Sequence, residues 1–289
     1  MELAIISGKG GTGKSSISAA FATLEKNVLL ADCDVDAANL HIIFNPTHEE
    51  EEVYIAGQTA IIDYTICTNC GICKDYCRFD AIHFVNNRIE ISETTCDGCQ
   101  LCSRVCPCEA ITMVDNDKSR MYSGTFRNGK MVYGRLAPGE ENSGKLVNMV
   151  RAKVKAIAKS NGLNNIIIDG PPGIGCAAIS SITGVNNVLV VTEPTLSGLH
   201  DLERTLELVT KFNLKAWVLI NKFDLNPDMS LQIEKRCANL GIDIAGKLPF
   251  EPVFVDAMVN CKSVLEWAPE SAISKELKLI WSRINAPQA

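Results

Sequence analysis

Two runs of four cysteines with identical spacing constrain the fold of this chain more than any other feature. The first run is Cys67, Cys70, Cys73 and Cys77, and the second is Cys96, Cys99, Cys102 and Cys106, followed by Pro107. Both read C-x2-C-x2-C-x3-C, a spacing in which three thiolates wrap one iron–sulfur cubane and the fourth points away to another cluster. The spacing therefore predicts two 4Fe-4S clusters with crossed ligation. Their ligand sets are Cys67, Cys70, Cys73 and Cys106 for one cluster, and Cys96, Cys99, Cys102 and Cys77 for the other.

Disulfides and zinc sites are the other uses of eight cysteines that must be weighed. A disulfide framework is typical of short secreted chains, and we expect no secretory leader on this chain of 289 residues. Zinc sites are built from pairs of C-x2-C. They do not explain why the longer pattern C-x2-C-x2-C-x3-C occurs twice, or why a proline follows the second run. Iron–sulfur ligation is therefore the favoured interpretation. Arg78 stands where the first run would often carry proline, which affects the turn after Cys77 but not the number of ligands.

A phosphate-binding loop is predicted at the amino end of the chain. Residues 2–7 (ELAIIS) are expected to form a short apolar strand, and a G-x4-G-K-S pattern follows directly. Glycines let backbone amides surround phosphates, and the N-terminus of the following helix adds its positive dipole end. In this pattern Lys14 is expected to reach the β- and γ-phosphates, and the Ser15 hydroxyl is expected to ligate Mg²⁺. The predicted nucleotide-binding residues of the loop are Gly8, Gly10, Gly11, Thr12, Gly13, Lys14, Ser15 and Ser16.

A second lysine, Lys9, lies inside the loop, where it cannot easily serve the phosphates of its own subunit. Its position resembles the signature lysine of the deviant P-loop ATPases, the MinD/ParA/Mrp and nitrogenase iron protein superfamily. Residues 28–36 (VLLADCDVD) and 166–173 (IIIDGPPG) resemble the two switch segments of that superfamily, in family order. The resemblance implies a nucleotide-sandwich dimer, of two copies or with a homologous subunit, in which Lys9 contacts the partner's phosphates.

The same resemblance assigns roles to three aspartates. It implies that Asp34 positions the attacking water, that Asp32 lies near the metal, and that Asp169 holds Mg²⁺ through water. Carboxylates at strand ends that face a phosphate site are what metal-assisted phosphoryl transfer requires. The predicted catalytic residues are Lys9, Lys14, Asp34 and Asp169.

The sequence leaves two alternatives for the base of the nucleotide. Residues 221–224 (NKFD) match the N-K-x-D pattern that selects guanine, at the end of a predicted strand. In the resembled ATPases an asparagine at this strand end contacts adenine, and residues 247–251 (KLPFE) resemble the loop that flanks the base. This implies ATP, with Asn221 and Pro249 at the adenine. GTP stays open as an alternative, because the Asp224 carboxylate could accept hydrogen bonds from guanine N1 and N2.

Apolar strand-like runs alternate with helical stretches over most of the chain. The runs are residues 28–31, 165–169, 188–192 and 216–221, and the amphipathic stretches are residues 144–160, 199–211 and 229–240. This alternation predicts an α/β P-loop fold with a mostly parallel sheet that helices cover on both faces. Residues 118–135 are expected to form a hairpin that turns at Asn128-Gly129.

The cysteine segment interrupts this alternation and is predicted to be a domain of its own. Residues 60–66 and 110–114 are expected to be its outer strands, and residues 81–91 a hairpin that turns at Asn86-Asn87. The duplicated pattern resembles the α+β fold of two-cluster bacterial ferredoxins. The predicted domains are a P-loop ATPase domain in two parts, residues 1–57 and 115–289, and an inserted ferredoxin domain, residues 58–114.

Composition and charge narrow the environment and the partners. The formal net charge of −6 gives no indication of nucleic-acid binding. Thirteen cysteines predict a reducing, cytoplasmic location. No apolar run approaches the roughly 18 residues of a membrane span, so we expect no stable membrane insertion. Residues 273–284 carry apolar residues at helical spacing, and we expect this helix to dock on the sheet rather than on a membrane.

One further cysteine has two interpretations. Cys176 lies seven residues after Asp169, the offset at which a cysteine of the nitrogenase iron protein ligates a cluster that bridges the dimer. No second cysteine of that kind lies between Cys108 and Cys176, so two subunits would supply only two thiolates. A ligand role and a structural role for Cys176 both stay open.

These features predict an ATP-hydrolysing iron–sulfur protein whose cofactors are ATP, Mg²⁺ and two 4Fe-4S clusters. ATP would close a dimer and hydrolysis would reopen it, which would gate electron transfer through the clusters to a protein redox partner. The alternative is an assembly or delivery factor for metalloclusters, as in Mrp-type relatives. Such carriers tend to hold a labile cluster between C-x2-C pairs near the C-terminus, where this chain has only Cys237 and Cys261. A positioning ATPase would have no use for eight cluster ligands.

Overall fold

The computed structural model describes residues 1–140 and 143–286. The chain divides into two compact units. The first comprises Met1–Glu51, Met121–Gly134 and the chain from Ser143 onward. The second comprises Glu52–Arg120 and a short return segment that begins at Arg135. The cysteine runs lie in the second unit and the phosphate-binding loop in the first.

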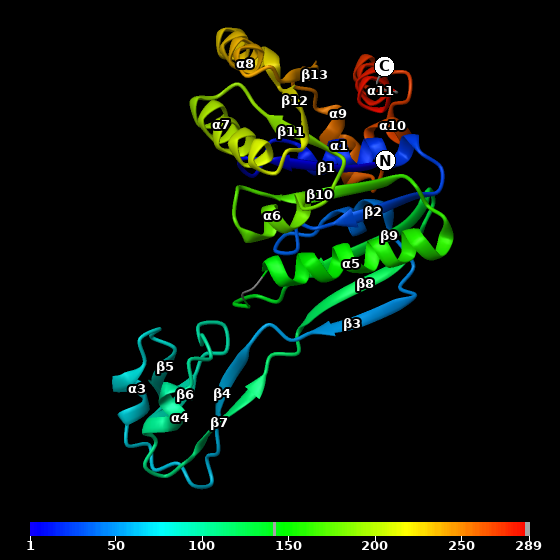
Figure 1. The fold of residues 1–289 in the computed structure, drawn as a ribbon. Coiled ribbons are helices and arrows are strands. Elements are labelled where there is room, and N and C mark those ends of the chain that lie inside the picture. Colours follow the sequence, from blue (N-terminus) through cyan, green and yellow to red (C-terminus); the bar gives the residue numbers. More distant parts are fainter. Residues whose placement is uncertain (141–142, 287–289) are drawn as a thin grey trace. The chain divides into compact units, whose positions relative to one another are not determined.

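A large twisted sheet forms the centre of the first unit (Figure 1). Within the described residues it has nine strands, in the order β13 (Asp243–Leu248), β12 (Lys215–Asn221), β11 (Asn187–Thr192), β1 (Glu2–Ser7), β10 (Ile166–Pro172), β2 (Val28–Asp32), β9 (Gly129–Arg135), β8 (Ser119–Phe126) and β3 (Glu50–Tyr54). The seven strands from β13 to β9 pair in parallel. The predicted α/β fold with a mostly parallel sheet is therefore confirmed.

Helices cover both faces of this sheet, because alternate residues of each buried strand point to opposite sides. The helices of the unit are α1 (Lys14–Leu24), α2 (Leu40–Phe44), α5 (Ser143–Asn161), α6 (Cys176–Ile182), α7 (Leu196–Lys211), α8 (Pro227–Asn239), α9 (Val253–Val259), α10 (Val264–Trp267) and α11 (Ala272–Asn285), with a 3₁₀ turn, η1, at Phe223–Leu225. Helix α1 packs on α10, α11 and α2, whereas α5 packs on α6 and β2.

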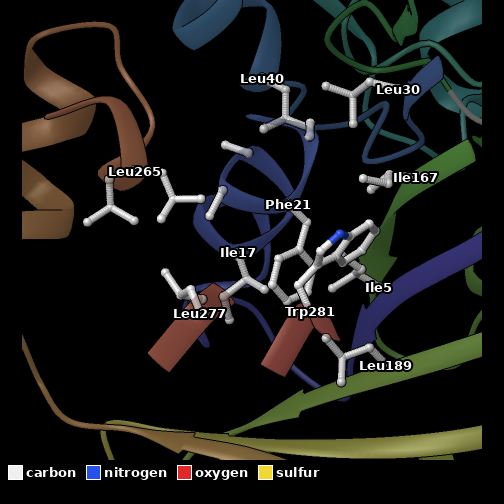
Figure 2. Packing of buried hydrophobic residues seen from close by; sticks show 14 of the residues in the cluster. Ile5, Ile17, Phe21, Leu30, Leu40, Ile167, Leu189, Leu265, Leu277 and Trp281 are labelled. Atoms are coloured by element: carbon white, nitrogen blue, oxygen red, sulfur yellow. The ribbon is translucent and has the colours of Figure 1, made fainter. Parts of the chain in front are cut away.

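The core on the α1 side is built from alternate strand residues and two aromatic rings (Figure 2). Leu3 and Ile5 of β1 point into it, together with Phe21 of α1 and Trp281 of α11. The rings of Phe21 and Trp281 lie 4.8 Å apart between centroids. The apolar side of α11 is thus buried against α1 and β13, as the sequence predicts for residues 273–284.

Most predicted elements of this unit are confirmed, and one turn is displaced by a residue. Strands β8 and β9 are sheet neighbours joined by Arg127 and Asn128, whereas the sequence pattern predicts a turn at Asn128-Gly129. Gly129 instead begins β9 beside β2, where a Cβ atom would collide with the Val28 carbonyl. The glycine therefore serves strand packing rather than the turn.

Among the described residues, no helix combines the length and the apolar character needed to span a lipid bilayer.

The second unit is small and internally repeated. Strands β4 (Gln58–Ile62) and β7 (Ile111–Asp115) pair antiparallel, and β5 (Ile82–Val85) and β6 (Arg88–Ile91) form a hairpin. Asn86 and Asn87 connect the hairpin with φ angles of 50° and 60°, the left-handed values of a type I′ turn, as predicted. Short helices α3 (Ile72–Tyr76) and α4 (Leu101–Val105) occupy matching positions in the two cysteine runs and pack on each other.

Candidate functional site

Five neighbouring strands bring the polar side chains of the candidate site to one edge of the sheet. Strand β1 runs into the phosphate-binding loop. Asp32 and Asn221 are the last residues of β2 and β12, Glu193 directly follows β11, and Asp169 of β10 pairs with Asp32. These strands are parallel, so their carboxyl ends meet at the same edge. Side chains that are far apart in the sequence thereby surround one loop.

The loop between β1 and α1 depends on its glycines. Gly11 and Gly13 have φ angles of 80° and 90°, a region that residues with a side chain rarely adopt. The backbone at Gly13 also passes so close to the Asn221 amide that a Cβ atom would collide with it. Helix α1 begins directly after Gly13, so its free amide groups and positive dipole end face the loop.

A cavity of about 670 Å³ opens at this loop, a volume typical of cofactor sites. Asp34 and Asp36 of the first switch segment line it, as does Met258 of α9. The loop residues in its wall are Gly10, Gly11, Thr12, Gly13, Lys14, Ser15 and Ser16. The described lining does not include three other predicted nucleotide-binding residues: Gly8, Asn221 and Pro249.

Asp169 is the hub of the polar contacts beneath the cavity. Its fully buried carboxylate accepts hydrogen bonds from the Ser15 and Ser18 hydroxyls, at 2.7 Å each. The Lys14 ammonium lies 3.1 Å from the same carboxylate and 3.4 Å from that of Asp34. Three residues predicted to act on Mg²⁺ and phosphate, Lys14, Ser15 and Asp169, are thus in direct contact, with Asp34 beside them.

Asp32 lies deeper than the resemblance implies. Its carboxylate is fully buried and accepts hydrogen bonds from the backbone N–H groups of Asp34, Asn39 and Leu40, at 3.1, 3.2 and 3.1 Å. Burial and the adjacent Asp169 carboxylate together raise the pKa of Asp32 to about 8, against the lowering effect of Lys14. The observed contacts of Asp32 hold the first switch segment in shape.

The charges around Lys14 do not balance. Burial lowers the pKa of Lys14, but Asp169, Asp34 and Asp32 outweigh this and hold the pKa above its ordinary value. One ammonium therefore contacts two carboxylates, those of Asp169 and Asp34, while the raised pKa of Asp32 keeps that carboxyl group protonated at neutral pH. Burial likewise raises the pKa of Asp34, against the lowering effect of Lys14. A carboxylate-rich site of this kind suits a hard divalent cation such as Mg²⁺.

Lys9 does not point away from its own subunit. Its ammonium lies 2.7 Å from the Glu193 carboxylate and donates to the hydroxyls of Thr195 (3.1 Å) and Ser197 (2.9 Å). The Glu193 carboxylate also binds Lys222 at 3.0 Å. Sequence reasoning missed Glu193, because its place in the site depends on β11 lying beside β1.

The N-K-x-D segment supports the loops rather than lying open for a base. The Asn221 amide donates to the Thr12 carbonyl at 2.8 Å, and Lys222 donates to the Gly11 carbonyl at 2.9 Å. The Asp224 carboxylate accepts a hydrogen bond from the backbone N–H of Phe250 at 2.7 Å. Each of the three polar residues of the motif therefore binds a backbone group of this chain.

The eight run cysteines line two separate cavities in the second unit. One is lined by Cys67, Cys70, Cys73 and Cys106, together with Cys108. The other is lined by Cys77, Cys96, Cys99 and Cys102. These groupings are the two crossed sets that the spacing predicts. In the residues that the structure describes, however, no three His, Cys, Asp or Glu side chains are gathered closely enough to hold a metal ion.

Backbone amides and burial affect the thiols at these cavities. The N–H groups of Asn69, Ala81 and Ala110 point at the sulfur atoms of Cys67, Cys77 and Cys106, at 3.4, 3.4 and 3.3 Å. Burial raises the pKa of Cys102 to about 11, and the neighbouring thiols of Cys96 and Cys99 act in the same direction. Binding a metal would therefore have to displace protons from these thiols.

Cys176 belongs to the lining of neither thiol cavity. It is exposed at the start of α6 and lines the nucleotide cavity. A ligand role for it stays a prediction.

Comparison with known proteins identifies the nucleotide-binding part. Residues 3–264 match the CobQ/CobB/MinD/ParA nucleotide binding domain. The uncharacterized protein MJ0578 of Methanocaldococcus jannaschii is 37% identical over 288 residues, which cover 99% of this chain and 96% of that protein. The uncharacterized protein MJ0579 of the same organism is 27% identical over 296 residues, 92% of each chain.

Solved structures with the same fold include septum site-determining proteins. MinD of Pyrococcus horikoshii, complexed with Mg-ADP, has a TM-score of 0.58 at 17% identity, covering 99% of this chain and 96% of its own. Apo McdA of Cyanothece has a TM-score of 0.59 at 15% identity, covering 99% and 100%. None of the matches described supports the predicted ferredoxin domain or its clusters; they concern the nucleotide-binding fold. The chain belongs to the CobQ/CobB/MinD/ParA family of nucleotide-binding domains.

Proposed function

We propose that this family member is an ATP-hydrolysing iron–sulfur protein in which a nucleotide-driven dimer switch gates electron transfer to a protein partner. The ATPase half has the stronger support. Lys14, Ser15 and Asp169 form one contact network below a cavity lined by the loop, and a similar structure, MinD of Pyrococcus horikoshii, holds Mg-ADP.

The iron–sulfur half rests on one observation. Two distant cysteine runs line two cavities, and in each cavity three cysteines of one run meet the fourth cysteine of the other. Disulfide pairing gives no reason for this exchange, whereas two cubane clusters require it. The donor chemistry is also appropriate, although the thiols would have to move closer together to bind a cluster: four thiols line each cavity, and backbone N–H groups are aimed at Cys67, Cys77 and Cys106. Bound there, two 4Fe-4S clusters would each store and pass a single electron.

The chain's own residues supply the remaining steps. Lys14 would neutralise the phosphate charge, while Ser15 and Asp169 would hold Mg²⁺ directly and through water. Asp34, which lines the cavity, would orient the attacking water. Lys9 would cross to the phosphates of a second subunit. That subunit could be another copy or a homologous chain, since Methanocaldococcus jannaschii has two relatives of this protein.

The nucleotide site and the thiol cavities would be coupled through the polypeptide segment that connects them. Glu52, where the second unit begins, follows Asp34 by only 18 residues. A segment that is ordered by phosphate contacts at Asp34 would therefore pull directly on the chain that leads to the thiol cavities.

The proposal is tested by anaerobic purification followed by iron and sulfide analysis and electron paramagnetic resonance of the reduced protein. We expect about eight irons per chain and two interacting 4Fe-4S signals. With ATP and a reductant, the clusters should stay bound and cycle between redox states. If the purified protein contained zinc and no iron, the iron–sulfur part of the proposal would be wrong, and the ATPase part would be unaffected.

Exposure of one thiol in each set favours a second candidate, a cluster delivery factor. Cys70 and Cys99 are exposed, and an exposed ligand is where an acceptor's thiolate can attack. ATP-dependent loss of iron from the protein to an apo-acceptor, measured after separating the two on a column, would favour delivery. Retention of iron through many ATP turnovers would favour electron transfer.

A further inference from the structure

The three hydrogen-bond donors of the Lys9 ammonium all have acceptors on its own subunit. Glu193, Thr195 and Ser197 provide them, at 2.7, 3.1 and 2.9 Å. A lysine ammonium has three donors and no more. A phosphate of another subunit can therefore bind Lys9 only by displacing these contacts.

Among the three acceptors, Glu193 supplies the charge. Thr195 and Ser197 lie at the start of α7, where the Thr195 hydroxyl also accepts the Gly198 N–H as the helix cap. The N-terminal end of a helix is the positive end of its dipole, which disfavours an ammonium. The carboxylate of Glu193 is what makes this location favourable for Lys9.

Glu193 is also connected to the phosphate-binding loop. Its second oxygen binds Lys222 at 3.0 Å, and Lys222 donates to the Gly11 carbonyl at 2.9 Å. Burial raises the pKa of Glu193, but the hydrogen bonds from Lys9 and Lys222 outweigh it and lower the pKa, so the group stays ionised at neutral pH. Both lysines therefore meet a permanent negative charge.

We infer that Glu193 is an intramolecular latch, which holds Lys9 on its own subunit and so opposes ATP-dependent association of two subunits. The inference rests on the proposed dimer switch, in which Lys9 acts across the interface. Association then has to exchange the Glu193 carboxylate for phosphate as the partner of Lys9.

The first test is Glu193→Gln, which keeps the shape of the side chain and removes its charge. The protein concentration for half-maximal association with ATP should fall by about two- to fivefold, the range of a partly exposed ion pair. The measurement is sedimentation velocity with ATP and with ADP. The matched control is Glu203→Gln, which breaks another ion pair of α7, to Arg236 at 2.7 Å, away from the loop. Glu193→Asp should behave more like the unmodified protein.

A second readout does not depend on association. Acetylation of Lys9, followed by mass spectrometry against exposed Lys26 as internal reference, should be faster in Glu193→Gln than in the unmodified protein. The affinity for ADP is measured in both, because Glu193 also holds Lys222, which supports the Gly11 carbonyl of the loop; it should change by less than the concentration for association does.

The outcomes separate the latch from the function on which it rests. Association that is unchanged in Glu193→Gln, or an equal gain in ADP affinity, overturns the latch and leaves the dimer switch standing. Failure of both proteins to associate with ATP overturns the dimer switch and the latch together. Neither result affects the iron content, which tests the cluster proposal separately.

Discussion

The Asp224 carboxylate holds the backbone N–H of Phe250 at 2.7 Å and thereby ties η1 to the 249–251 loop. In a guanine site the equivalent carboxylate would have to accept from the base. Here the carboxylate is engaged in a loop contact, and the neighbouring Asn221 amide supports the Thr12 carbonyl. The N-K-x-D pattern is therefore explained by structure and gives no reason to expect guanine selection.

Nucleotide preference tests this interpretation. We expect ATP to displace a fluorescent ATP analogue at a concentration at least about tenfold lower than GTP, the effect of one charged hydrogen bond. Asp224→Asn should leave this preference unchanged. If Asp224→Asn instead gained affinity for xanthosine triphosphate, whose C2 carbonyl pairs with an asparagine amide, Asp224 would be reading the base.

The Ser15 hydroxyl should account for the metal dependence of nucleotide binding. It donates to Asp169 at 2.7 Å, which orients its oxygen lone pairs for Mg²⁺. In Ser15→Ala we expect ATP affinity with Mg²⁺ to fall about tenfold, towards the value with EDTA. Titration calorimetry in both buffers checks this. Thr23→Ala, at the far end of α1, is the control and should change neither value; equal losses in both variants would contradict the role of Ser15.

The sequence predicted those features that depend on residues close together or on a fixed repeat. The loop from Gly8 to Ser15 and the crossed cysteine sets are of this kind. The contacts of Glu193 were not predictable, because they require β11 to lie beside β1, a strand order that no local pattern encodes. The backbone contacts of Asp32 were missed for a similar reason: they depend on how the chain folds back at Asn39 and Leu40.

The raised pKa of Asp32 predicts a pH dependence of stability in metal-free, nucleotide-free protein. The folded state keeps the Asp32 proton up to about pH 8, whereas an unfolded aspartate releases it near 3.8. Between these values the folded state binds more protons, so stability falls as the pH rises, by at most about 1.4 kcal/mol per pH unit from this group.

Asp32→Asn isolates this effect. The variant loses an acceptor for backbone N–H groups and should be less stable at pH 6, by about 1–3 kcal/mol. The difference between the free energies of unfolding of the variant and the unmodified protein should become smaller from pH 6 to pH 8. Urea denaturation at each pH measures this difference. Parallel stability profiles would mean that Asp32 is ionised across this range.

Crossed ligation predicts which cysteine substitutions share a phenotype. Cys106→Ser and Cys67→Ser should remove the same cluster, because both residues line one cavity, and should leave identical paramagnetic spectra. Cys77→Ser and Cys96→Ser should leave the other spectrum. Iron should drop from about eight to about four per chain in each case. Cys261 is exposed and provides the control: Cys261→Ser should keep all the iron. If Cys106→Ser and Cys96→Ser instead gave identical spectra, each cysteine run would ligate its own cluster, and the ligation would not be crossed.

Helix α11 offers a test of whether its apolar side stays buried against α1 and β13. The Trp281 ring lies 4.8 Å from the Phe21 ring between centroids, tilted by 39°, and its indole N–H donates to Glu25 at 2.9 Å. Trp281→Ala should lower the free energy of unfolding by about 3–5 kcal/mol. Leu279→Ala, which alters a side chain that is 51% exposed, should change the free energy of unfolding by no more than about 0.5 kcal/mol.

The unmodified protein should not sediment with anionic lipid vesicles, since the apolar side of α11 packs on α1 and leaves no apolar surface to insert. Vesicle binding that is lost in Leu279→Ala would mean that the exposed side of α11 is the membrane contact.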